Sequence, residues 1–267
     1  MGSSATVSNS LFSRIFSIAR NTFREAIRDR VLYNLVIFVL LITACAILLG
    51  ELTDGQEART IVNIGLNAVL LFGTFIAIFV GVGLVSKEIE KKTVYAIFAK
   101  PVRRTEFIVG KFLGLCSTLF VNTAIMGVGI MVALLYVGGG DLIGPLWAAT
   151  LLIFLELTIT TAIAILFSSF SSPALSALMT FLVFLIGHLT ASLRDLGKTM
   201  GSAAASAVLE GLYYVLPNLS LFSFRTEAAI GMVPTGSMMI GAFGYALAYI
   251  VVVLAIASAV FSRRNFK

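Results

Sequence analysis

The chain has 267 residues, of which 59% are hydrophobic and 12% are charged, and its mean hydropathy is +1.03. A soluble domain usually carries about 25% charged residues, so this composition excludes an ordinary soluble enzyme. The 19 Lys and Arg residues against 13 Asp and Glu point to a membrane protein whose orientation depends on where the positive charges fall.

The first 30 residues divide into two segments. Residues 1–10 are small and polar, and we expect them to be disordered. Residues 11–30 place phenylalanine and isoleucine on one helical face and arginine on the opposite face. This pattern predicts an amphipathic helix in the membrane plane. A soluble helix packed on a partner protein is the alternative.

Six apolar runs follow, each long enough for the ~20 residues that cross a bilayer. We therefore predict an all-α, polytopic domain over residues 31–267. The six predicted spans are 31–50, 61–85, 112–137, 142–167, 174–193 and 237–261.

The positive charges predict the orientation of these spans. Segments on the N-terminal side of the membrane hold 15 of the 19 Lys and Arg residues, and segments on the far side hold 4. By the positive-inside rule both termini lie in the cytoplasm, so we expect a multi-pass protein of the cytoplasmic (inner) membrane.

The loop 86–111 between the second and third spans carries seven basic residues. Its apolar residues Val94, Tyr95, Ile97 and Phe98 lie between lysines, and Pro101 ends any helix near the preceding residue. An exposed apolar patch needs a protein partner or the lipid interface. The pattern alone leaves both open, including a simple positive anchor whose aromatic rings dip into the headgroups.

This loop resembles a known family. Its segment Lys100-Pro101-Val102-x-Arg104-x-Glu106-Phe107, preceded by Glu88, Glu90 and Thr93, is similar to the first intracellular loop of type-2 ATP-binding-cassette (ABC) exporter permeases. The similarity is closest to their multicopper-enzyme-maturation branch. Residues 166–178 and 213–231 resemble the same family, and the order of the three segments strengthens the match.

The resemblance implies a transmembrane permease that dimerises, couples to two copies of a separate ABC ATPase and exports a substrate by alternating access. The helix at residues 94–98 would be the coupling helix, and residues 11–30 the connecting helix. ATP and Mg²⁺ would bind the ATPase subunit. The implied ATPase-coupling residues are Glu88, Glu90, Thr93, Val94, Tyr95, Ile97, Phe98, Pro101 and Arg104.

The chain contains no G-x-x-x-x-G-K-[ST] motif, no C-x-x-C and no H-E-x-x-H, and it has one histidine. We therefore expect no catalytic residue, metal site or cofactor in this chain, and no nucleic-acid partner. A non-transporting membrane anchor and a proton-coupled carrier that uses Glu156 remain alternative functions.

Glu156 lies near the middle of the fourth span, where an ionised carboxylate costs on the order of 2.5–3.5 kcal/mol. We expect Asn122 or Thr123 of the third span to hydrogen-bond it, with Thr160 nearby on its own helix. A substrate path or proton-sensitive site and a structural polar contact between helices are both open for Glu156. His188 and Asn67 are predicted nearer the outer surface, where they would line an exit or be satisfied polar groups between helices.

Two further features concern packing and the outer surface. Gly110 and Gly114 form a G-x-x-x-G pair, which predicts a close helix contact. The extracytoplasmic loop 194–236 contains an apolar stretch at 203–215, closed by Pro217, that predicts short helices at the outer leaflet. The sequence leaves open whether a periplasmic partner binds this loop.

Overall fold

The computed structural model describes residues 11–26, 37–38, 41–42, 44, 48, 55–90, 103–199, 210–211, 213 and 215–263. Within these residues every regular element is helical, which confirms the all-α prediction. The elements are α1 (Leu11–Ala26), α3 (Glu57–Glu90), α5 (Arg104–Val137), the 3₁₀ helix η2 (Gly140–Leu142), α6 (Ile143–Ser168), α7 (Pro173–Thr199), the 3₁₀ helix η3 (Leu219–Phe222), α9 (Arg225–Ala229) and α10 (Gly236–Arg263).

Five helices of the described part are long and apolar enough to cross a membrane: α3, α5, α6, α7 and α10. They correspond to the second to sixth predicted spans. Of the first predicted span, 31–50, the described residues 37–38, 41–42, 44 and 48 are helical. Phe38 among them is buried and packs edge-on against Phe72 of α3. The rest of that span lies outside the described residues, so six spans stay a prediction.

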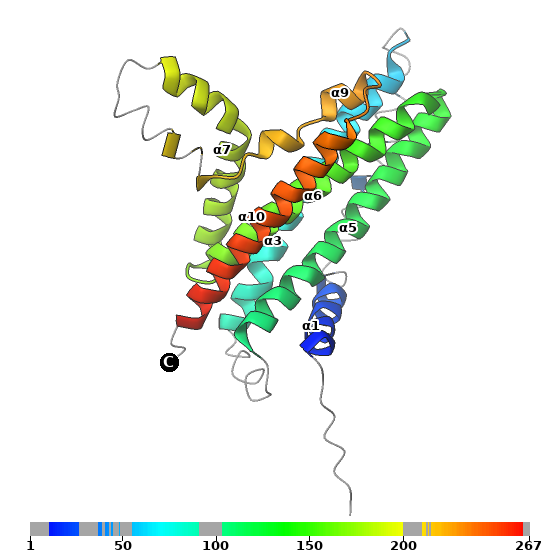
Figure 1. The fold of residues 1–267 in the computed structure, drawn as a ribbon. Helices are drawn as coiled ribbons and strands as arrows, with labels where there is room; N and C mark the ends of the chain where they lie inside the picture. Colours follow the sequence, from blue (N-terminus) through cyan, green and yellow to red (C-terminus); the bar gives the residue numbers. More distant parts are fainter. Residues whose placement is uncertain are drawn as a thin grey trace, which may run out of the picture.

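Helix α6 lies at the centre of the bundle and packs against α3, α5, α7 and α10 (Figure 1). In its most apolar stretch 78% of the residues are buried, against 22% in α7 and in α10. Gly73 of α3 allows this packing, since a β-carbon there would come 2.4 Å from Leu157 of α6. The outer helices α7 and α10 therefore offer most of their surface to lipid or to another protein.

Helix α1 packs along the first turns of α5, at the end of the bundle where α10 finishes (Figure 1). A β-carbon on Gly110 would lie 2.7 Å from Ile18, and one on Gly114 would lie 2.6 Å from Thr22. The G-x-x-x-G pair of α5 is thus the surface on which α1 docks, as the spacing predicted for some close helix contact. Phe12 and Phe16 of α1 remain exposed, and their position relative to lipid stays a prediction.

The loop between the second and third spans is shorter than residues 86–111. Helix α3 continues to Glu90, and α5 begins at Arg104, eight residues before the predicted start of its span. The charges of Glu106 and Lys111 predict that both belong to the loop; in the structure both are buried helical residues that form ion pairs. The remaining residues 91–102, including the predicted coupling helix, lie outside the described part.

A short connection joins α5 to α6. Gly138 ends α5 with a φ of +82°, a left-handed conformation that favours glycine, and its N–H bonds the last carbonyls of the helix. Helix η2 follows, and α6 begins directly after it. The two spans therefore form an antiparallel helical hairpin.

The predicted extracytoplasmic loop 194–236 is partly helical in the structure. Helix α7 continues into it as far as Thr199, residues 210–211, 213 and 215 are helical, and η3 and α9 follow Pro217. The backbone N–H of Asn218 donates a 2.9 Å hydrogen bond to the hydroxyl of Tyr245, which belongs to α10. Most of the apolar stretch 203–215 lies outside the described residues.

Candidate functional site

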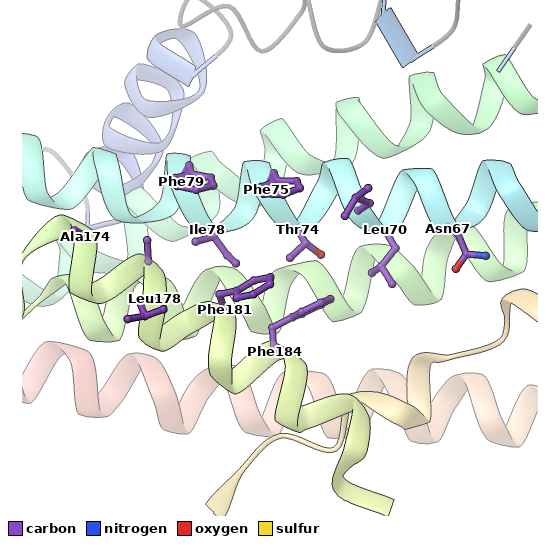
Figure 2. A pocket seen from close by; sticks show the side chains of 12 residues that line it. Asn67, Leu70, Thr74, Phe75, Ile78, Phe79, Ala174, Leu178, Phe181 and Phe184 are labelled. Carbon is purple, nitrogen blue, oxygen red and sulfur yellow. The ribbon is translucent and has the colours of Figure 1, made fainter. Parts of the chain in front are cut away.

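An apolar groove of about 710 Å³ runs between α3 and α7. Thr74 and Ile78 of α3 point toward α7, and Phe181 and Phe184 of α7 point toward α3 (Figure 2). Its lining residues are Asn67, Leu70, Leu71, Thr74, Phe75, Ile78, Phe79, Ala174, Ala177, Leu178, Phe181 and Phe184. The groove therefore lies between the second and fifth predicted spans.

The groove has a polar group near one end. Asn67 lies at the end away from Ala174 and Phe79 (Figure 2), and its amide Nδ2 donates to the carbonyl and side-chain oxygens of Asn63, each at 2.8 Å. Thr74 is buried, and its hydroxyl has no hydrogen-bond partner among the described residues. Asn67 thus lines the groove. His188, which the sequence analysis expects at a similar depth, does not line the groove and contacts Glu156 instead.

Glu156 and His188 form an ion-pair contact between α6 and α7. Glu156 Oε1 lies 3.1 Å from His188 Nε2, and the Glu156 side chain is fully buried. Neither of these two atoms has another hydrogen-bond partner among the described residues. Among the described residues no hydrogen-bond donor reaches Glu156 Oε2.

The expected partners of the Glu156 side chain are therefore wrong. Asn122 Nδ2 donates to the carbonyl of Thr118 at 2.9 Å, and Thr123 donates to the carbonyl of Leu119 at 2.9 Å. Thr160 does contact Glu156, but through the backbone carbonyl, at 3.1 Å. Asn122 and Thr123 turn back to their own helix, as hydroxyl and amide side chains in apolar surroundings commonly do.

A sequence signal for the true partner did exist. Glu156 lies 12 residues before the end of α6, and His188 lies 15 residues after the start of α7. At 1.5 Å per residue these positions differ by only about 4–5 Å in depth. The sequence analysis expects His188 nearer the outer surface; counted from the turn that α6 and α7 share, its depth is instead close to that of Glu156.

The start of α5 is a cluster of charged contacts. The carboxylate of Glu106 accepts a 3.2 Å hydrogen bond from the N–H of Arg103 and lies 3.4 Å from Arg14 of α1. Lys111 Nζ, which is buried, lies 3.7 Å from Glu25 of α1. Two ion pairs thus fix α1 to the start of α5, beside the Gly110 and Gly114 contact.

Arg104 fixes α10 to the same end of α5. Its guanidinium donates hydrogen bonds to the carbonyls of Phe261 and Ser262, at 3.1 and 2.7 Å. The rings of Phe107 and Phe261 stack with their centres 5.8 Å apart. Arg104, the first residue of α5, therefore caps the C-terminal end of α10.

The other predicted ATPase-coupling residues are not placed relative to a partner. Glu88 and Glu90 belong to the last turn of α3. Thr93, Val94, Tyr95, Ile97, Phe98 and Pro101 lie outside the described residues. Their roles stay predictions.

The site combines an apolar groove, a buried polar pair and a charged cluster at one end of the bundle. These features suit the binding of an apolar molecule and the movement of helices more than a chemical reaction.

Several long apolar helices make the chain a multi-pass helical membrane protein. The family model of the ABC-2 family transporter proteins matches residues 16–266, and the chain therefore belongs to that family. Its members are the transmembrane component of an ABC transporter and lack a nucleotide-binding domain. A search of curated proteins found no match.

Proposed function

We propose that this chain is the permease subunit of an ATP-driven exporter, located in the cytoplasmic membrane with both termini in the cytoplasm. Two copies form a dimer, and each couples to a separate ABC ATPase that binds ATP and Mg²⁺. Family membership supports the transporter role and a partner ATPase. The similarity of residues 88–114 to multicopper-enzyme-maturation permeases supports placing the chain in that branch.

The groove between α3 and α7 is the observation that carries the proposal. It is open along one side, and its exposed lining includes Leu71, Phe75 and Phe79. A two-fold axis beside this face would bring the groove of a second copy opposite the first. The two halves would then enclose one apolar pathway, which a single chain leaves open.

The start of α5 supports the coupling to an ATPase. The predicted coupling helix at residues 94–98 is followed closely by Arg103, whose backbone N–H is capped by Glu106, and by Arg104, which holds α10 through its carbonyls. A push on the loop would therefore move α5, α1 and α10 together. Such a rigid-body displacement at one membrane surface is a common way to switch a bundle between two arrangements.

Purification of the tagged chain in mild detergent from its host tests the proposal. We expect a Walker-motif ATPase to be retained in stoichiometric amount with measurable ATP hydrolysis. Phe98→Asp should abolish this association without loss of membrane insertion. The matched control is Phe170→Asp, since Phe170 is an exposed phenylalanine in the turn between α6 and α7, on the same predicted membrane side.

Unchanged ATPase retention in Phe98→Asp would contradict the assigned coupling helix. Recovery of the chain as a dimer with no ATPase would contradict the permease proposal and favour a membrane anchor. Substrate transport in vesicles without any ATPase, lost on Glu156→Gln, would instead favour a proton-coupled carrier.

A further inference from the structure

The contact between Glu156 and His188 is the one polar side-chain link that the described residues show between α6 and α7 at mid-membrane depth. It joins the most buried helix of the bundle to one of the least buried. The carboxylate is fully buried, and one of its oxygens has no hydrogen-bond partner among the described residues. The chemistry of this pair follows from the second ring nitrogen of His188.

His188 Nδ1 lies 3.1 Å from the backbone carbonyl of Phe184. A carbonyl oxygen can only accept a hydrogen bond, so Nδ1 must carry a proton. Nε2, which faces Glu156, is therefore protonated only if the ring is cationic. A neutral ring would present a lone pair to the carboxylate.

The 3.1 Å approach of Nε2 to Oε1 thus requires one proton between them. Two lone pairs repel each other, whereas N–H⁺ facing O⁻ or O–H facing N attracts. In both cases the pair has no net charge, the form that an apolar bilayer interior favours. Removal of the proton leaves a carboxylate against a lone pair, and the contact must open.

Helix α9, which packs against α6, carries the charged residues Arg225 and Glu227. Arg225, at the start of α9, is the other charged group that acts on His188; its Nη1 is buried without a hydrogen-bond partner among the described residues. On α3 the nearby polar groove residues Asn67 and Thr74 do not titrate, and η3 has no titratable side chain.

We propose that Glu156 and His188 form a buried proton-binding site whose single proton holds α7 against α6 and thereby sets the width of the groove. The link to the groove is Phe184, which lines it (Figure 2). The ring of Phe184 lies edge-on to the His188 ring, with centres 4.7 Å apart. A change at His188 therefore reaches the groove wall directly.

The inference rests on the proposed function only for the use of the groove. The proton site itself belongs to one chain and can be tested on the purified protein in lipid nanodiscs without an ATPase. Loss of ATPase association would therefore leave this test unaffected, and failure of the proton site would leave the permease assignment intact.

His188 is the single histidine of the chain, so ¹⁵N-histidine labelling with a histidine-free affinity tag gives one ring signal. We expect Nδ1 to be protonated throughout a titration from acid to alkaline pH. We expect Nε2 to change from a proton-sharing to an unprotonated nitrogen as the pH rises. An unprotonated Nδ1, or an Nε2 signal that never changes, would overturn the proposal.

Spin labels at Leu151 of α6 and Leu185 of α7 report the movement. Both side chains are exposed, and neither lines the groove. Cys45 and Cys116 are replaced by alanine in this background. The distance distribution between the labels should broaden and shift to longer values over the same pH range in which Nε2 loses its proton. An unchanged distribution would contradict the proposed link to the groove.

Glu156→Gln is the decisive variant, because the glutamine amide N–H can donate to the neutral Nε2 at every pH. We expect both the Nε2 signal and the label distance to become constant. His188→Gln provides the second test by label distance, and it serves alone if Glu156→Gln does not fold. A label distance that still depends on pH as in the unmodified chain, in whichever variant folds, would refute a proton site at this pair.

Discussion

Gly114 of α5 and Thr22 of α1 approach so closely that a β-carbon on Gly114 would lie 2.6 Å from the β-carbon of Thr22. The same β-carbon would lie 2.6 Å from the backbone carbonyl oxygen of Ala19. Backbone atoms cannot move aside as a flexible side chain can. The docking of α1 on α5 therefore depends on this glycine.

Gly114→Ala should displace α1 from α5. Overpacking of this kind costs about 1–3 kcal/mol, which corresponds to a roughly 5- to 160-fold larger population of undocked α1. Limited trypsin cleavage at Arg20 and Arg24 should accelerate accordingly. Gly244→Ala in α10 is the control, since a β-carbon there meets nothing within 4 Å; equal cleavage of the two variants would contradict the close contact.

Glu106 combines two roles that substitutions can separate. Glu106→Gln keeps an oxygen for the N–H of Arg103 but loses the charge opposite Arg14. Glu106→Ala loses both, and removal of an N-terminal cap alone costs about 1 kcal/mol. We expect the melting temperature in detergent to fall in the order unmodified, glutamine, alanine. A glutamine variant as unstable as the alanine variant would mean that the cap contributes little.

Arg104 should control fraying at the end of α10. Arg104→Ala removes the donors to the carbonyls of Phe261 and Ser262, and hydrogen bonds to a charged group contribute about 1.5–3 kcal/mol. Hydrogen exchange of the last turn of α10 should rise at least several-fold, while α6 stays protected. Arg104→Lys, which can donate to one carbonyl, should give an intermediate rate. Exchange unchanged by either substitution would contradict the capping role.

The groove face should lie at the contact between two copies. Phe79 lines the groove and Phe243 lies on α10, and each side chain is 59% exposed. In a background without Cys45 and Cys116, Phe79→Cys should give a crosslinked dimer in membranes with a short bismaleimide, and Phe243→Cys should give several-fold less. Comparable yields from both positions would argue against a dimer across the groove.

The apolar runs predicted the five helices that are long and apolar enough to cross a membrane, because a span needs an uninterrupted apolar length. They failed at the start of α5, where Glu106 and Lys111 are charged yet helical; the partners that make this possible, Arg14 and Glu25, come from α1. A search for charge-free runs ends at the first charged residue. It therefore misses a helix that continues through charged residues whose ion-pair partners come from another segment.

The polar site shows the complementary limit. Depth along a helix can be counted from the sequence, and it brings Glu156 near His188. The direction in which the Asn122 side chain points around its helix axis cannot be obtained by counting residues. This direction determines that Asn122 donates a hydrogen bond to the carbonyl of Thr118 and not to Glu156. The G-x-x-x-G pair likewise predicted a close contact but not that α1 would fill it. Tertiary packing supplies the orientation and the partner.

The short connection between α5 and α6 has a consequence for biosynthesis. Its charged residue is Asp141 alone, and Gly127 of α5 packs closely on Trp147 of α6, so the two helices can enter the bilayer together as a hairpin. Because translation proceeds from the N-terminus, α6 leaves the ribosome before α7, and Glu156 reaches the bilayer before His188. During that interval the carboxyl group must stay neutral or remain at the insertion machinery, and the arrival of α7 completes the protein's central ion pair.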